Sequence, residues 1–313
     1  MRRRRNIGAA VALAAAALAA LGAPALAAAA PQGSPWGRDY FGNPELVTQD
    51  GEKVRFYDDL VKDRLVVVDF IYTRCTKQCG LMTANLARVK RELGDRVGKD
   101  IFFVSVSLDP RDTPEVLKRY ADAFHAGPGW KFLTGKKEDV QALRAKFGDK
   151  EAVVNHRPNI NVGNDRTGDW WIANALDNPK FTAVIIGGWM DPSFKGDAKN
   201  RSYAEARRDS VPLLSRAETI FKEKCASCHT GQDPVGGSLD GVSERRDRKW
   251  LTRWIKDPPK VLAQGDPTAK ALLAKAQGVP MPELALSDAD VAALVDWLAR
   301  NDREARAATA PAR

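Results

Sequence analysis

Short apolar runs alternate with amphipathic segments through the first two thirds of the chain. The runs from Arg64 to Tyr72 and from Ile101 to Leu108 are rich in β-branched and aromatic residues. Such runs are typical of strands buried on both faces of a sheet. Between them, apolar residues spaced three or four apart predict a helix from Gln78 to Leu93. Three further strands are expected, at Trp130–Leu133, Asn159–Val162 and Phe181–Gly187.

Two more helices are expected among these strands. Thr113 and Pro114 suit an N-cap and a first helical position, so a helix should begin there and end near His125. A second helix is expected from Asp139 to Phe147. The alternation of strands and helices predicts a mostly parallel sheet covered by helices. Because functional residues of such sheets lie beyond the C-terminal ends of the strands, the segment after Tyr72 becomes a candidate site.

The pattern changes after Asp191. The chain is polar and rich in charges up to Asp209, which predicts a linker between two domains. Beyond it only three short helices are expected, at Ala217–Lys224, at Lys249–Ile255 and from Ser287 to Asn301. Roughly 90 residues with so little structure cannot bury a large core alone. We therefore expect the second domain to fold around a bound group.

The N-terminus has the composition of an export signal. Arg2 to Arg5 form a basic block, and an uncharged apolar run from Ile7 to Ala30 follows, with small residues near Ala25 suited to cleavage. The run is also long enough for an uncleaved membrane anchor. We expect an exported, periplasmic protein, either soluble after cleavage or anchored to the inner membrane.

Together these patterns divide the chain into six segments. We expect an export signal or anchor (1–30), a linker (31–42), an α/β domain (43–192), a second linker (193–210), a small all-α domain (211–304) and a disordered tail (305–313). The formal net charge is +9, and four of these charges belong to Arg2–Arg5, which leaves about +5 elsewhere. Since no other Lys/Arg run occurs, nucleic-acid binding is not indicated.

The four cysteines form two close pairs, and none is left over to link the fold by a disulfide. Cys225, Cys228 and His229 form the pattern C-x-x-C-H, the attachment motif of a c-type haem. The two thiols add to the haem vinyl groups, and the histidine becomes the proximal iron ligand. The alternatives are a redox C-x-x-C pair and half of a zinc site. A zinc site needs a second Cys/His pair nearby, and none follows.

Met281 is the candidate for the second axial ligand of the haem iron. It lies between Pro280 and Pro282, which keep the backbone extended, and a thioether ligand would raise the reduction potential. The alternative is a methionine packed beneath a loop. Residues 211–304 resemble a small class I cytochrome c, which implies one covalent haem c and electron transfer. The resemblance rests on Phe221–His229, Leu239, Trp250–Trp254, Met281 and the final helix.

The loop after the haem motif departs from the cytochrome c pattern. That family usually has a proline there, whose carbonyl accepts a hydrogen bond from the proximal histidine. In this chain Gly237 stands at that place. We expect the Gly237 carbonyl to accept the bond from His229, within a softer loop.

Cys75 and Cys79 follow a predicted strand and enter a predicted helix. The helix N-terminus, with Arg74 and Lys77 nearby, favours thiolates. Two thiolates can act as a redox pair or bind a soft metal such as Cu(I). A copper site needs a third ligand. Of the three histidines, His229 is assigned to haem, His156 precedes a predicted strand, and His125 ends a helix and is the poorer candidate. The alternative for His156 is an ordinary surface position.

Residues 43–189 resemble the Sco/SenC family, thioredoxin-fold copper proteins of cytochrome oxidase assembly. The C-x-x-x-C spacing separates that family from ordinary thioredoxins. The resemblance rests on Phe70–Cys75 with Cys79, on Ser107–Glu115 and on Phe132–Gly135.

The resemblance implies an α/β thioredoxin-like domain in which Cys75, Cys79 and His156 bind one copper ion. The chain departs from the family pattern at Thr76 and Gly80, where prolines are usual. It departs again before His156, where Asn155 replaces an acid.

These features predict an exported copper-binding and thiol redox protein that assists maturation of a copper site of the cytochrome c oxidase type, with a fused c-type haem for electron transfer. The expected partner is the copper-bearing subunit of a cytochrome oxidase, or another exported redox protein. Two alternatives stay open. One is a metal-independent thiol–disulfide oxidoreductase or thiol peroxidase-like enzyme that uses Cys75 and Cys79 as its redox pair. The other is a simple electron carrier.

Overall fold

The computed structural model describes residues 35–149, 158–190, 215–231 and 233–309. In the α/β part, residues 35–190 with the gap just given, the described strands form one seven-stranded sheet in the order β2-β1-β5-β4-β3-β6-β7. The strands are β1 (Glu45–Thr48), β2 (Lys53–Arg55), β3 (Leu65–Ile71), β4 (Ile101–Ser107), β5 (Trp130–Gly135), β6 (Asn159–Asn164) and β7 (Asp169–Asn174).

The sheet is mixed, so the prediction of a mostly parallel sheet is wrong. Only the neighbouring pairs β3–β4 and β4–β5 are parallel, and the other four pairs are antiparallel. Two of the four antiparallel pairs are tight hairpins. One turns at Gly51 between β1 and β2, and the other at Gly168 between β6 and β7, both with positive φ. Strands joined by so short a turn can only run antiparallel.

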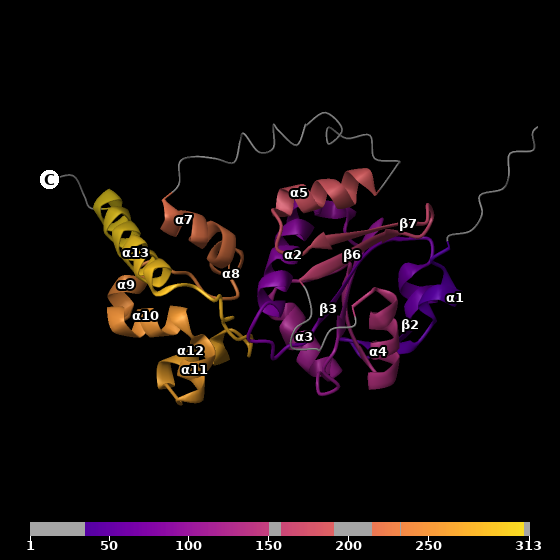
Figure 1. The fold of residues 1–313 in the computed structure, drawn as a ribbon, viewed down its shortest axis with the longest axis horizontal. Coiled ribbons are helices and arrows are strands. Elements are labelled where there is room, and N and C mark those ends of the chain that lie inside the picture. The colour runs from indigo at the N-terminus through magenta and orange to yellow at the C-terminus, as the bar shows by residue number, and fades with distance from the viewer. Residues whose placement is uncertain (1–34, 150–157, 191–214, 232, 310–313) are drawn as a thin grey trace, which may run out of the picture. The chain divides into compact units, whose positions relative to one another are not determined.

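Helices cover both faces of this sheet. In Figure 1, α2 and α5 lie together on one side, and α1 and α4 on the other. The core has two halves because successive strand residues point to opposite faces. In β3, Leu65 and Val67 pack with α2 and α3, whereas Val66 and Val68 pack with α1 and α4. The helical elements are α1 (Arg38–Phe41), η1 (Phe56–Val61), α2 (Cys79–Leu93), η2 (Gly94–Arg96), α3 (Pro114–Ala123), α4 (Lys137–Lys146), α5 (Pro179–Val184) and η4 (Ile185–Trp189).

The predicted strand Phe181–Gly187 is helical. The side chain of Asn178 accepts hydrogen bonds from the amides of Lys180 and Phe181, at 3.0 and 3.4 Å, and Pro179 occupies the first turn. These residues form a complete helix start. A short apolar run fits a buried helix as well as a strand, and the residues before it decide between the two.

The predicted linker 31–42 is folded at its C-terminal end. Phe41, the last residue of α1, is buried, and its ring centroid lies 4.9 Å from those of Phe147 and Trp170. Burying an aromatic ring offsets the entropy of ordering this short segment.

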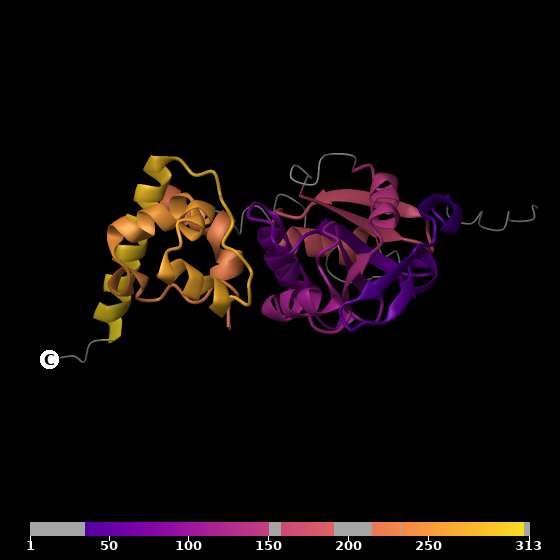
Figure 2. The ribbon, with the colours of Figure 1, turned by 90° about the horizontal axis from the view of Figure 1, so that it is seen from below.

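The helical part, residues 215–309 with residue 232 left out, has eight described helical elements. In Figure 2 the C-terminal helix α13 is yellow, and it packs against α7, α9 and α10. Val291, Leu294 and Val295 of α13 lie at the centre of the core. The elements are α7 (Arg216–Ile220), η6 (Phe221–Cys225), α8 (Ala226–His229), α9 (Val242–Arg245), α10 (Arg248–Lys256), α11 (Pro258–Ala263), α12 (Pro267–Lys275) and α13 (Asp288–Thr309).

Two predictions for this part need correction. Asp257 and Asp266 accept hydrogen bonds from the amides of Lys260 and Ala269, at 3.0 and 2.9 Å, and so begin two helices that the sequence analysis missed. The predicted disordered tail 305–313 is helical up to Thr309. Its alanines are strong helix formers and simply prolong α13.

Among the described residues, no helix combines the length and apolarity needed to span a bilayer. The predicted export signal or anchor and the 193–210 linker lie outside the described residues.

Candidate metal and haem sites

Cys75 and Cys79 lie where the predicted strand–helix junction placed them. Cys75 is in the loop after β3, and Cys79 is the first residue of α2. Both side chains are buried. The sulfur of Cys75 accepts a hydrogen bond from the Cys79 amide at 3.4 Å, and the Cys75 amide donates to the Tyr72 carbonyl at 3.1 Å. The loop therefore holds the two thiols together beneath the surface.

The two thiols differ strongly in acidity. A hydrogen bond from the Cys79 side chain, aided by the amides of Cys79 and Lys77 and by Tyr72, lowers the pKa of Cys75 to about 5. Burial, together with the neighbouring Cys75, raises the pKa of Cys79 well above its usual range. At neutral pH the metal-free pair is thus one thiolate that accepts a hydrogen bond from one thiol.

Arg74 was predicted to stabilise a thiolate, but it pairs with a carboxylate instead. Its guanidinium donates to the carboxylate of Asp109 at 2.7 Å. Backbone amides at the start of α2 and the partner thiol stabilise the thiolate instead. This is the helix N-terminus effect that the sequence predicts.

Asp69, in the middle of β3, is a further titratable group below the cysteines. Its Oδ1 accepts a hydrogen bond from Ser105 Oγ at 2.5 Å, and Ser105 in turn accepts from Trp130 Nε1 at 2.8 Å. The other oxygen has no hydrogen-bond partner in the described part of the chain. Burial raises the pKa of Asp69 to about 7. In the sequence, Asp69 stands out as an acid that interrupts an apolar run, but its role could not be predicted because the run reveals nothing about its partners.

His156, the predicted third copper ligand, lies outside the described residues. The next described residue is Pro158, just before β6. β6 runs antiparallel to β3, with Ile160 opposite Asp69. The first residues of β6 therefore lie beside the C-terminal end of β3, which leads to Cys75. His125 is exposed after the end of α3, as expected. Within the described ranges, no three Cys, His, Asp or Glu side chains gather as a metal-binding group.

Cys225 and His229 of the C-x-x-C-H motif border a mainly apolar cavity of about 440 Å³ in the helical part. Burial raises the pKa of Cys225 and of Cys228 to about 12. These thiols thus stay protonated, unlike Cys75. The cavity is lined by Cys225, His229, Met281 and mainly apolar side chains, among them Phe221, Leu239, Val242, Leu251, Trp254, Ile255, Leu272, Leu294 and Leu298.

The orientation of His229 is set by the loop that follows it. Its Nδ1 donates a hydrogen bond to the Gly237 carbonyl at 3.0 Å, as predicted, so the other ring nitrogen, Nε2, carries the free lone pair. Gly236 is required beside the ring. A Cβ atom at this position would lie 2.6 Å from Cε1 of His229.

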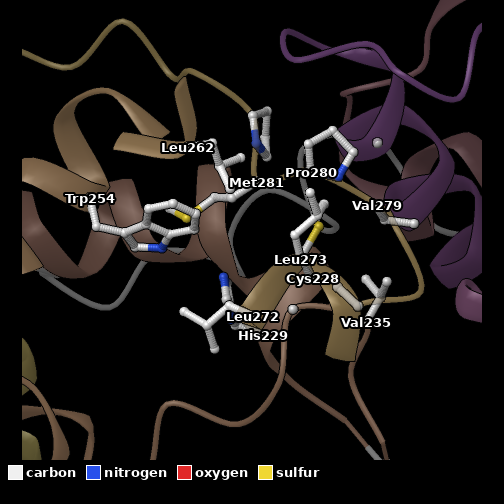
Figure 3. Close-up of a pocket in the computed structure, with 14 residues that line it drawn as sticks. Cys228, His229, Val235, Trp254, Leu262, Leu272, Leu273, Val279, Pro280 and Met281 are labelled. Carbon is white, nitrogen blue, oxygen red and sulfur yellow. The ribbon is translucent and has the colours of Figure 1, made fainter. Parts of the chain in front are cut away.

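Met281 borders the same cavity as His229. Figure 3 shows the side chains of Met281 and His229 entering from different sides, with the indole of Trp254 beside Met281. Trp254 stacks on Trp250 at a centroid distance of 5.5 Å, and Asp266 accepts from Trp250 Nε1 at 3.0 Å. An apolar wall, two adjacent thiols, an oriented imidazole and a thioether together fit a covalently attached haem.

Comparison with protein-family models assigns the two parts separately. Residues 34–163 match the SCO1/SenC model, and residues 214–302 match the cytochrome c model. The fold class predicted from the sequence, an α/β thioredoxin-like domain followed by a small all-α cytochrome c domain, is confirmed. A cytochrome c domain implies haem c.

The curated relatives found are named as SCO proteins, and each match covers about a third of this chain. An SCO2-like protein of Rickettsia prowazekii is 34% identical over 112 residues, which are 36% of this chain and 52% of that protein. The SCO1 protein homolog of Bacillus subtilis is 34% identical over 89 residues, 28% of this chain and 45% of that protein. The chain thus spans about half the length of these relatives. A copper-bound ScoI structure from Bradyrhizobium japonicum is 24% identical, with a TM-score of 0.40, over 46% of this chain and 96% of that chain.

Proposed function

An SCO1/SenC domain and a cytochrome c domain share one chain, and we propose that it is an exported copper-binding and thiol redox protein. It assists maturation of a copper site of the cytochrome c oxidase type and carries a c-type haem for electron transfer. The observation that carries this proposal is the buried Cys75/Cys79 pair, one thiolate and one thiol, at the end of β3. Its partner is the copper-bearing subunit of such an oxidase, or another exported redox protein.

We assign copper binding to Cys75, Cys79 and His156. Thiolate and imidazole are the ligands that Cu(I) prefers in proteins. Cys75 is already ionised at neutral pH, and metal binding displaces the proton that it shares with Cys79. His156 precedes Pro158 by two residues, which in extended chain span at most about 7 Å. Pro158 immediately precedes β6, which begins beside the C-terminal end of β3 that leads to Cys75.

We assign covalent haem attachment to Cys225 and Cys228, with His229 and Met281 as the axial ligands. The hydrogen bond from His229 to Gly237 holds Nε2 free for the iron. The bound haem supplies one-electron transfer, and a Cu(I)/Cu(II) change is also a one-electron step. Exchange between a dithiol and a disulfide moves two electrons, so a single haem suits copper chemistry better.

The two alternative functions make different demands on the chain. A metal-independent thiol oxidoreductase needs Cys75 and Cys79 but not His156. A simple electron carrier needs neither cysteine. Copper binding that depends on all three residues therefore separates the proposal from both alternatives.

The test is an anaerobic Cu(I) titration of the reduced, haem-loaded protein against a competing chelator, repeated with His156→Ala. We expect one tight equivalent in the unaltered chain and an affinity at least about tenfold lower in the variant, because one of three ligands is lost. His125→Ala is the matched control, since it removes an exposed histidine of the same domain. Weak binding, or binding indifferent to His156, would contradict the copper site and favour the thiol oxidoreductase.

A further inference from the structure

The loop between β4 and α3 forms hydrogen bonds with the segment that carries Cys75. Asp112 of this loop is buried, and its carboxylate accepts three hydrogen bonds. The Thr73 amide donates to Oδ2 at 2.9 Å, the Thr73 hydroxyl to Oδ1 at 2.7 Å, and the Ser107 hydroxyl to Oδ2 at 2.6 Å. Both oxygens of this buried side chain thus accept hydrogen bonds, and Thr73, two positions before Cys75, donates two of the three.

The next residue, Arg74, is held by the same loop. Asp109 accepts from Arg74 at 2.7 Å and from the Arg111 side chain at 3.0 Å. These two guanidiniums keep the pKa of Asp109 well below its usual range. The Asp112 amide donates to the Asp109 carbonyl at 2.9 Å, so the two acids belong to one rigid turn. This turn therefore fixes both residues that lead into Cys75.

We propose that Asp112 is a positioning residue, which through Thr73 fixes the loop that carries Cys75 and so sets the geometry of the two sulfur atoms for copper. This inference rests on the function proposed above. A metal ligand must be held close to its productive position by hydrogen bonds from residues behind it. Thr73 lies beyond the last residue of β3, outside the hydrogen-bond ladder of the sheet. Its amide donates to the Asp112 carboxylate and not to a neighbouring strand.

A second buried acid provides a matched control. Asp165 lies in the turn between β6 and β7, beside the start of β3, and is also buried. It accepts a hydrogen bond from the Asp63 amide at 2.9 Å and from the Tyr57 hydroxyl at 3.2 Å. Its chemistry resembles that of Asp112, but it holds the opposite end of the strand. Removing either acid weakens the fold, whereas only Asp112 supports the cysteine loop.

The experiment compares Asp112→Ala with Asp165→Ala in the haem-loaded full chain by two measurements. The first is Cu(I) affinity by chelator competition. The second, without metal, is the equilibrium with oxidised glutathione, which takes two electrons from the Cys75 thiolate and the Cys79 thiol. One proton comes from Cys79 and one from water, and the products are the Cys75–Cys79 disulfide and two glutathione thiols. We expect Asp112→Ala to lower both equilibrium constants at least about tenfold, because lost bonds to a buried charge free the loop. We expect Asp165→Ala to change each by less than about twofold.

Thr73 supplies a milder test, which also serves if Asp112→Ala does not fold. Thr73→Val should weaken both equilibria, and Thr73→Ser, which keeps the hydroxyl, should restore them. The proposal is overturned if Asp112→Ala behaves like Asp165→Ala, or if Thr73→Val and Thr73→Ser are equivalent. If the unaltered chain binds no copper, the copper function fails by itself, and the glutathione measurement still decides the role of Asp112.

Discussion

At the scale of single residues, the two cysteine pairs show how surroundings set reactivity. Cys75 has hydrogen-bond donors around its sulfur and a pKa lowered to about 5. Cys225 has an apolar surrounding and a pKa raised to about 12. The first pair is ready to act as a nucleophile or to bind a soft metal, and the second stays protonated in its apolar pocket.

The acidity of Cys75 should depend on the side chain of Cys79. Replacing Cys79 by Ala removes the hydrogen bond that contributes most to the thiolate, so the pKa of Cys75 should rise from about 5 toward its ordinary value. The measurement is the rate of iodoacetamide alkylation of the reduced, metal-free protein from pH 4 to 9. Cys79→Ser is the control, because a hydroxyl still donates. Identical profiles for the two variants would contradict this origin of the acidity.

At the scale of elements, β3 brings the groups of the site together. All seven of its residues are buried, and it lies between β4 and β6. Its C-terminal end leads to Cys75, the neighbouring end of β4 leads to Asp112, and β6 begins beside the C-terminal end of β3 on its other side. The cost of this arrangement is the buried Asp69, whose charged form lacks full hydrogen bonding.

Asp69 should make stability depend on pH. Its pKa is raised from 3.8 to about 7 in the folded state, so the folded protein holds the proton more tightly than the unfolded chain. The protein is therefore most stable below pH 4 with respect to this group. It loses up to about 4 kcal/mol as pH rises through 7. Denaturant unfolding of the unaltered chain and of Asp69→Asn from pH 4 to 9 tests this.

In that experiment the free energy of unfolding of Asp69→Asn should not decline with rising pH. Above pH 7 this variant should be more stable than the unaltered chain, because it buries no charge. Parallel pH profiles for the two proteins would show that the pKa of Asp69 is the same in the folded and the unfolded chain.

At the scale of the whole molecule, the two domains rely on different sources of stability. The sheet domain has a continuous two-sided core of its own. The helical domain surrounds a cavity of about 440 Å³. The cavity is lined mainly by apolar side chains, which a covalently attached haem would shield from water, so the haem contributes to the stability of this domain.

The helical domain should therefore unfold when haem cannot be attached. Cys225→Ser with Cys228→Ser should lose much of the helical circular dichroism and become sensitive to limited proteolysis after residue 215. The matched control, Cys75→Ser with Cys79→Ser, removes the other pair and should keep both properties of the parent protein. A haem-free double variant with full helix content would show that the helices fold without the group.

Local patterns in the sequence were sufficient for much of this protein. The C-x-x-C-H motif, the strand before Cys75 and the Thr113–Pro114 helix start depend only on neighbours along the chain, and the family models and the observed elements agree with them. Gly237 could be named as the acceptor for His229 because it stands at the loop position whose carbonyl accepts this bond in the cytochrome c family that the segment resembles.

Only the tertiary structure decided the features that depend on distant partners. The strand prediction for Phe181–Gly187 failed because an apolar run has no unique period. β1 and β2 have only four and three residues, and β7 is mostly exposed, so none of them forms a long buried run. The contrast in acidity between Cys75 and Cys79 arises from burial and hydrogen bonds. Asp112 and Thr73 are 39 positions apart and meet only because β3 and β4 pair in parallel. Sequence determines which groups are available, and non-local packing decides which of them meet and how strongly their charges are felt.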